Sequence, residues 1–180
     1  MAEMRRRRKM KVMVAMDDSE CSFYALKWAL DHVFVTPEMG TVLAEEPSSD
    51  EADMVVLVHV QQPFQHYAFP AGPAVYATTS VVESVKKAQE ENSTALMSRA
   101  LQMCRTKPSI KAETLILEGD PKDRICNATE QMQMDLLVVG SRGLGTIKRA
   151  FLGSVSDYCA HHAKCPILIV RPPKETTATK

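Results

Sequence analysis

Short apolar runs alternate along this chain with longer stretches in which apolar residues recur every three or four positions. Five of the short runs are predicted to be strands: Lys11–Met16, Met54–Val60, Glu113–Glu118, Asp135–Val139 and Pro166–Val170. The run at 54–60 has no polar residue except one histidine, a pattern typical of a strand that is buried on both faces in a parallel sheet.

The stretches between the runs carry the helical period. Four helices are predicted: from the N-cap Ser19 to about Val35, from Val81 to Cys104, from Pro121 with the apolar face Ile125, Ala128 and Met132, and over Ser154–Ala163. Gly119-Asp120-Pro121 predicts a turn, an N-cap and a proline in the first helical position. Segments 36–53 and 61–80 are rich in proline and polar residues and are predicted to be loops.

This alternation predicts an α/β fold, an open parallel five-stranded sheet with helices on both faces. We find no internal repeat and no second core, so we expect a single domain over residues 10–173, between a basic flexible tail at 1–9 and a flexible tail at 174–180. The proline that opens the run 166–170 favours an edge strand. An apolar edge strand is prone to aggregate unless it is covered, and a symmetric partner would cover it.

Charge and cysteine content exclude several classes of protein. The formal net charge is zero, and we interpret the basic run Arg5–Arg8 and the acidic run at 38–53 as solvated segments, so no nucleic-acid partner is indicated. No stretch approaches the roughly 18 apolar residues of a membrane span, and the short run after the basic start is not a signal peptide. The five cysteines have no regular spacing and are expected to be reduced, which favours the cytoplasm.

The segment that points to chemistry is a glycine-spaced loop. Gly140 follows the run 135–139, Gly143 comes three residues later, and Gly153-Ser154 opens the last predicted helix. Glycines allow positive φ and let backbone N–H groups approach an anion, and a helix N-terminus favours phosphate. The hydroxyl groups of Ser154 and Ser156 would add hydrogen bonds.

Asp17 ends the first predicted strand across the switch point of such a sheet, where ligands bind. Its carboxylate is suited to a ribose hydroxyl, an adenine amine or a phosphate-bound Mg²⁺. The loop matches neither the P-loop nor the dinucleotide fingerprint, so from the residues alone turns and a helix cap remain a competing interpretation of the glycines.

The spacing Gly140-x₂-Gly143-x₉-Gly153-Ser154 resembles the ATP-binding signature of universal stress proteins. So do Val14-Ala15-Met16-Asp17-Asp18-Ser19, Leu57-Val58-His59-Val60, Gly119-Asp120-Pro121 and the end of the chain from Cys165 to Val170. The resemblance extends over about residues 10–172 and is to the ATP-binding branch of the family, in its plant-type single-domain form.

The resemblance implies a Rossmann-like sheet of order 3-2-1-4-5 and a homodimer through the strand Pro166–Val170. It implies an adenine nucleotide, ATP or AMP or ADP, with Mg²⁺ accompanying the nucleotide and Asp17 as a possible ligand of that ion. The residues that it places around the nucleotide are Ala15, Met16, Asp17, Val60, Val139, Gly140, Arg142, Gly143, Gly153, Ser154, Val155 and Ser156. The expected function is a nucleotide-dependent stress-response switch read by a downstream protein partner.

Two other functions remain open: a weak ATPase or nucleotide transferase, and a nucleotide-free redox or chaperone-like oligomer. Arg142, Lys148 and Arg149 offer positive charge for phosphate, but no residue is suggested as the group that orients water, and we expect no catalytic residue. Cys159, His161, His162 and Cys165 fit no common zinc spacing, and the cysteines are expected to be packing residues. His59 is expected to be a hydrogen-bonded core histidine.

Overall fold

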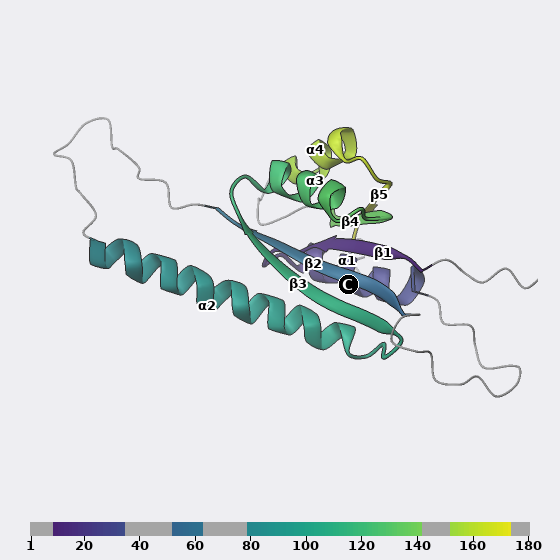
Figure 1. The fold of residues 1–180 in the computed structure, drawn as a ribbon, viewed down its shortest axis with the longest axis horizontal. Helices are drawn as coiled ribbons and strands as arrows, with labels where there is room; N and C mark the ends of the chain where they lie inside the picture. Colours follow the sequence, from purple (N-terminus) through teal and green to yellow (C-terminus); the bar gives the residue numbers. More distant parts are fainter. Residues whose placement is uncertain (1–8, 35–51, 63–78, 142–151, 174–180) are drawn as a thin grey trace, which may run out of the picture.

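The computed structural model describes residues 9–34, 52–62, 79–141 and 152–173 (Figure 1). Strands and helices alternate along these ranges. They are β1 (Lys11–Ala15), α1 (Glu20–His32), β2 (Asp53–Gln61), α2 (Thr79–Cys104), β3 (Ile110–Glu118), α3 (Pro121–Gln131), β4 (Leu136–Gly140), α4 (Ser154–His162) and β5 (Ile167–Val170).

All strand pairings are parallel, and the sheet has the order β3-β2-β1-β4-β5. The predicted fold class and strand order are therefore confirmed. The central strand β1 contributes Val12, Met13 and Val14, none of which is exposed to solvent. β5 is an edge strand, as the proline before it predicted.

Helices cover both faces of the sheet, as Figure 1 shows, with α1 and α2 on one side and α3 and α4 on the other. Side chains alternate between the faces along each strand, so two apolar clusters form. Val12, Val14, Val55 and Leu57 pack beneath α1 and α2. Met13, Val56, Val58 and Leu137 pack beneath α3 and α4.

Element boundaries differ from the predicted ones by up to three residues. β3 begins at Ile110 rather than at 113, because residues 110–112 pair with the first residues of β2, a contribution that no local pattern reveals. β1 ends at Ala15, yet the N–H of Met16 still donates to the Val58 carbonyl at 2.8 Å. Most of the predicted loops 36–53 and 61–80, and nearly all of the tails 1–9 and 174–180, lie outside the described residues.

Two predicted helix caps are confirmed. Ser19 has extended backbone dihedral angles, and its hydroxyl accepts a hydrogen bond from the Ser22 N–H. The Asp120 carboxylate accepts from the Lys122 N–H at 2.9 Å, with Pro121 as the first helical residue. Gly119 has φ +134°, a conformation that disfavours any residue with a side chain, so the turn before α3 requires glycine.

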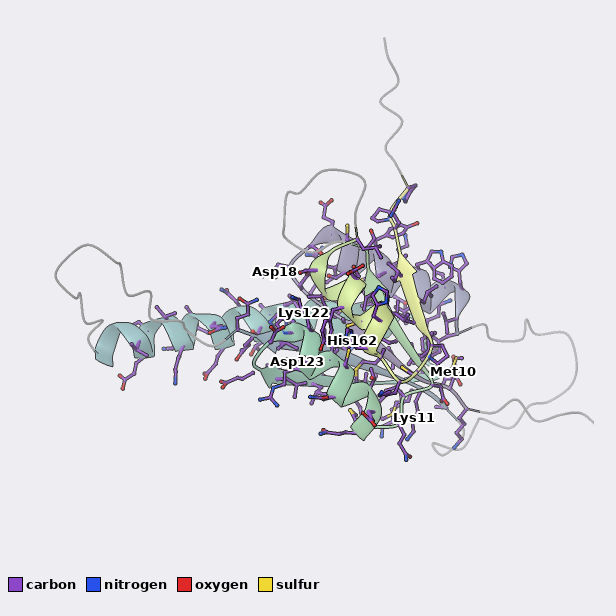
Figure 2. All side chains as sticks on the ribbon, turned by 90° about the horizontal axis from the view of Figure 1, so that it is seen from above. Met10, Lys11, Asp18, Lys122, Asp123 and His162 are labelled. Carbon is purple, nitrogen blue, oxygen red and sulfur yellow. The ribbon has the colours of Figure 1, made fainter. Side chains whose placement is uncertain are left out.

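At the amino edge of the sheet, two aspartates accept hydrogen bonds from the backbone at the start of β1. The Met10 N–H donates to Asp53 Oδ1 and the Lys11 N–H donates to Asp135 Oδ2, both at 2.9 Å. Figure 2 labels Met10 and Lys11 at this end of β1 and Asp18 beyond its other end. These bonds anchor the start of the central strand, and the opposite, carboxyl edge is where a ligand site is expected.

α2 is long enough that its first half extends past the sheet (Figures 1 and 2). Residues 83–88 are all exposed, including Val85 at 37%. α2 is long but too polar to cross a membrane, and no other helix in the described ranges is both long and apolar enough to do so.

Candidate functional site at the carboxyl edge of the sheet

The crevice expected from the topology lies between β1 and β4. These strands are neighbours, with Val14 beside Val138, and continuing this register by two residues brings Met16 beside Gly140. After β1 the chain leads through α1 toward β2, whereas after β4 it leads through α4 toward β5, so the two connections leave in opposite directions. Neighbouring strands are about 4.8 Å apart, which brings the segments after β1 and β4 together.

Gly140 is required by close packing rather than by its backbone conformation. Its φ is not positive, so the freedom of glycine to adopt positive φ is not used at this position. A Cβ atom here would lie 2.9 Å from the carbonyl carbon of Cys21, 3.0 Å from its oxygen and 3.1 Å from the Ser22 nitrogen. The first turn of α1 therefore rests directly on the end of β4, which brings the segment after β1 close to the glycine-spaced loop.

The segment after β1 is held by hydroxyl groups of α1. The Ser22 hydroxyl donates to the Asp17 carbonyl at 2.7 Å and lies 3.3 Å from the Asp17 N–H. Asp17 Oδ1 accepts from the N–H of Ser19 at 3.0 Å and also from its hydroxyl. Among the described residues Oδ2 has no hydrogen-bond partner, so one oxygen of a half-buried carboxylate is available to a ligand at this edge.

The N-terminus of α4 supplies backbone donors on the other side of the crevice. Its N-cap, Gly153, has extended dihedral angles and donates its N–H to the Ser141 carbonyl at 2.8 Å. The Gly153 carbonyl accepts from the Asp157 N–H at 2.9 Å, the first bond of the helix. The N–H groups of Ser154, Val155 and Ser156 consequently have no acceptor within the helix, and a helix N-terminus of this kind favours an anion.

The two serines of α4 have different surroundings. The Ser154 side chain is exposed, and its hydroxyl is accessible to a ligand. The Ser156 hydroxyl is buried and donates to the Gly153 carbonyl at 2.9 Å, with the Ser141 carbonyl at 3.4 Å. In this structure the Ser156 hydroxyl therefore closes the helix cap, and the residue offers its backbone N–H at the helix N-terminus.

The remaining predicted residues divide between the two faces of the sheet. Four apolar residues belong to the cluster beneath α3 and α4: Ala15, Val60, Val139 and Val155. Met16 is only 4% exposed and packs in the other cluster, beneath α1 and α2, so its side chain points away from the others and only its backbone is available. Arg142 and Gly143 lie outside the described residues.

Sequence reasoning missed the residues that hold this site in place. Ser22 lies in no motif, although its partners Asp17 and Ser19 are close to it in sequence. Ser141 falls between the two glycines of the spacing, but its bonds to Gly153 and Val170 depend on the fold. His59 is hydrogen-bonded, as expected, but its partner is the Met16 carbonyl, 2.9 Å from the ring Nδ1. The histidine therefore lies at the rim of the site, next to Asp17.

The cysteines and histidines near α4 pack against neighbouring side chains. Cys159 is fully buried with its sulfur 3.7 Å from that of Cys126, and burial raises the pKa of the Cys159 thiol to about 12. His162 stacks on Tyr158, whose hydroxyl donates to Asp123 Oδ1 at 2.9 Å, a bond that raises the pKa of the phenol. Figure 2 labels Asp123 and His162 on their helices. No group of three or more metal-binding side chains is found in the described ranges.

Comparison with known proteins agrees with the sequence resemblance. Universal stress protein PHOS34 from Arabidopsis thaliana is 31% identical over 180 residues, an alignment that covers 92% of this chain but 63% of that protein. Universal stress protein A-like protein from the same plant is 29% identical over 171 residues, an alignment that covers 89% of this chain and 89% of that protein. A solved universal stress protein family protein from Arabidopsis thaliana with AMP bound has a TM-score of 0.60 at 25% identity, covering 94% of this chain and 96% of its own.

This chain thus spans less than two thirds of one plant relative and most of the other. The profile of the universal stress protein family matches residues 9–171, nearly the whole length. The chain therefore belongs to the universal stress protein family.

Proposed function

We propose that this protein binds an adenine nucleotide at the carboxyl edge of its sheet and acts as a nucleotide-dependent stress-response switch. The observation that carries the proposal is that two complementary groups lie beyond the carboxyl ends of the neighbouring strands β1 and β4. One is the set of N–H groups at the start of α4 that lack an acceptor within the helix. The other is the half-buried Asp17 carboxylate, whose Oδ2 has no partner in the described part of the chain.

These two groups recognise different parts of a nucleotide. The helix N-terminus attracts phosphate, whereas a carboxylate repels it and accepts hydrogen bonds from ribose hydroxyls. The nucleoside therefore lies toward Asp17 with its phosphates toward Ser154. Val60 and Ala15 offer apolar contact to the base. The AMP found in the Arabidopsis structure supports an adenine nucleotide as the ligand.

Mg²⁺ would accompany a di- or triphosphate. This ion is commonly held by one or two carboxylates together with substrate phosphates. Asp17 Oδ2 is an oxygen of the required kind, and the ion would bring the carboxylate and the phosphates together despite their like charges. AMP does not need this bridge, so a comparison of ATP with AMP, with and without Mg²⁺, distinguishes the two roles of Asp17.

The switch would be a homodimer formed through β5. The two edge strands of the sheet differ in character. β3 carries Lys111 and Glu113, whose charged groups are 2.8 Å apart, and charges of this kind discourage pairing with another strand. β5 carries Ile167, Leu168 and Ile169, all only partly buried. A second copy pairing along β5 would remove this apolar edge from water, and a downstream protein would recognise the dimer.

The first experiment identifies the ligand. Freshly purified protein is denatured, and released nucleotides are identified by mass spectrometry; emptied protein is then titrated calorimetrically with ATP, ADP and AMP, with Mg²⁺ or with EDTA. Near-stoichiometric nucleotide supports the proposal. A blank extract together with no heat of binding contradicts it. Steady release of ADP that Asp17→Asn abolishes would favour the ATPase alternative.

A matched pair of variants tests the site itself. Asp17→Asn keeps the shape of the side chain and one acceptor oxygen but removes the charge, and hydrogen bonds to charged groups contribute about 1.5–3 kcal/mol. We expect AMP affinity to fall about tenfold or more. Asp18→Asn makes the same change of charge on the neighbouring, exposed residue and should leave affinity within about twofold. Equal effects of the two variants would mean that Asp17 acts only through the general field.

A further inference from the structure

His59 links β2 to the segment after β1. Its side chain lies on the α1 and α2 face of the sheet, beside Ile116 in the β2–β3 register and in alternation with Val58 and Val60. The ring Nδ1 is 2.9 Å from the Met16 carbonyl oxygen. A carbonyl oxygen only accepts hydrogen bonds, so Nδ1 carries a proton and donates it to this bond.

This bond continues the attachment of β1 to β2 beyond the backbone ladder. The Met16 N–H donates to the Val58 carbonyl at 2.8 Å, and the carbonyl of the same residue receives the histidine ring. Both polar backbone groups of Met16 are thereby tied to β2, one through the main chain and one through a side chain. The peptide that joins Met16 to Asp17 has little freedom to rotate.

The following residue is tied to α1 instead. Asp17 receives the Ser22 hydroxyl at its carbonyl and the Ser19 N–H at Oδ1. The segment between β1 and α1 is therefore held from two directions, by His59 of β2 on one side and by serines of α1 on the other. The remaining carboxylate oxygen, Oδ2, is left in one orientation at the crevice.

We propose that His59 is a positioning residue for nucleotide recognition: by donating to the Met16 carbonyl it fixes the orientation of the Asp17 carboxylate. This inference rests on the proposed function. The histidine acts on the nucleoside end of the ligand, because it is bonded to Met16 beside Asp17, whereas the donors for phosphate belong to α4, whose N-cap is bonded to Ser141. Loss of the bond should weaken adenosine, AMP and ATP by the same factor when all three are measured in EDTA, where Asp17 has no Mg²⁺ to bind.

The test replaces the imidazole ring of His59 with side chains that either keep or remove the hydrogen-bond donor to the Met16 carbonyl. The amide nitrogen of asparagine is attached to Cγ, as is Nδ1 of histidine, so His59→Asn preserves a donor facing Met16. His59→Leu is of similar volume and has no donor. Removing one hydrogen bond of this kind is expected to lower the affinity for the ligand by about 2- to 10-fold. We expect His59→Leu to lose this factor for all three ligands and His59→Asn to stay within about twofold of wild type.

Calorimetry at a temperature well below unfolding measures the three affinities, and its stoichiometry reports the folded fraction of each variant. If His59→Leu does not fold, His59→Gln takes its place as a polar variant. Its amide lies one methylene further from the backbone than that of asparagine, so we expect the same loss of affinity as for leucine. The ratio of ATP to AMP affinity, both measured in EDTA, should be unchanged throughout, a result that general loosening of the site would not give.

Three results overturn the inference while leaving the proposed function in place. One is a donor-less variant with wild-type affinity, and the second is an equal loss in His59→Asn and His59→Leu. The third is a selective loss of ATP affinity in EDTA, which would assign the histidine to the phosphate end instead. If wild-type protein binds none of the three ligands, the proposed function fails, and the role of His59 fails with it.

Discussion

Replacing Gly140 with alanine tests whether the contact between β4 and α1 organises the site. The added Cβ would lie 2.9 Å from the Cys21 carbonyl carbon, whereas carbon atoms in contact are ordinarily about 3.5 Å apart. The first turn of α1 must therefore move away from β4 by about 0.6 Å. The clashing atoms are backbone atoms, so no change of rotamer relieves the contact.

The magnitude follows from two opposing effects. Overpacking of this kind costs about 1–3 kcal/mol. Alanine also restricts the unfolded chain, which returns about 0.4–1 kcal/mol because the φ of Gly140 is not positive. We expect a net destabilisation of about 1–2 kcal/mol, which for a chain of this size lowers Tm by roughly 2–8 °C.

Urea unfolding followed by the fluorescence of Trp28 measures this loss. Trp28 is the single tryptophan of the chain and lies on α1, the helix that must move. The control is Cys21→Ala, alone and combined with Gly140→Ala: the colliding carbonyl remains in both, so the double mutant should be additive. A Gly140→Ala protein as stable as wild type would refute the argument from close packing, and rescue by Cys21→Ala would show that a side chain is responsible.

Two further predictions concern the helix cap and the buried thiols. Asp120→Ala removes the acceptor for the Lys122 N–H and should cost about 1 kcal/mol in urea unfolding, whereas Asp120→Asn should cost less because asparagine is also a good cap. Burial raises the pKa of Cys104 to about 11 and that of Cys159 to about 12, from 9.0. The folded protein then keeps protons that the unfolded chain releases, so the free energy of unfolding should fall as pH rises above about 9. Urea unfolding at pH 8 and pH 10 checks this, and Cys104→Ala should reduce the slope; a slope that is the same with and without the thiol would contradict the assignment.

Several features followed from the sequence because they depend on neighbouring residues. The caps Ser19 and Asp120 act within three residues of themselves, and a proline after the cap reinforces the second. The five strands follow from short apolar runs in the sequence, and their parallel arrangement follows from the helices between them. The start of β3 does not follow in this way, because it depends on pairing with β2, which lies some 57 residues earlier, as the pair Asp53 and Ile110 shows.

The site required the tertiary structure. Its glycine and serine spacing is local, so the sequence alone predicts which backbone donors and which carboxylate lie at the carboxyl edge of the sheet. Only the fold decided what each residue does there. Gly140 admits the backbone of α1, Met16 turns its side chain to the opposite face, and His59 bonds a carbonyl 43 residues away. These roles arise from contacts between segments distant along the chain, and a local pattern of residue types carries no record of which segments will meet.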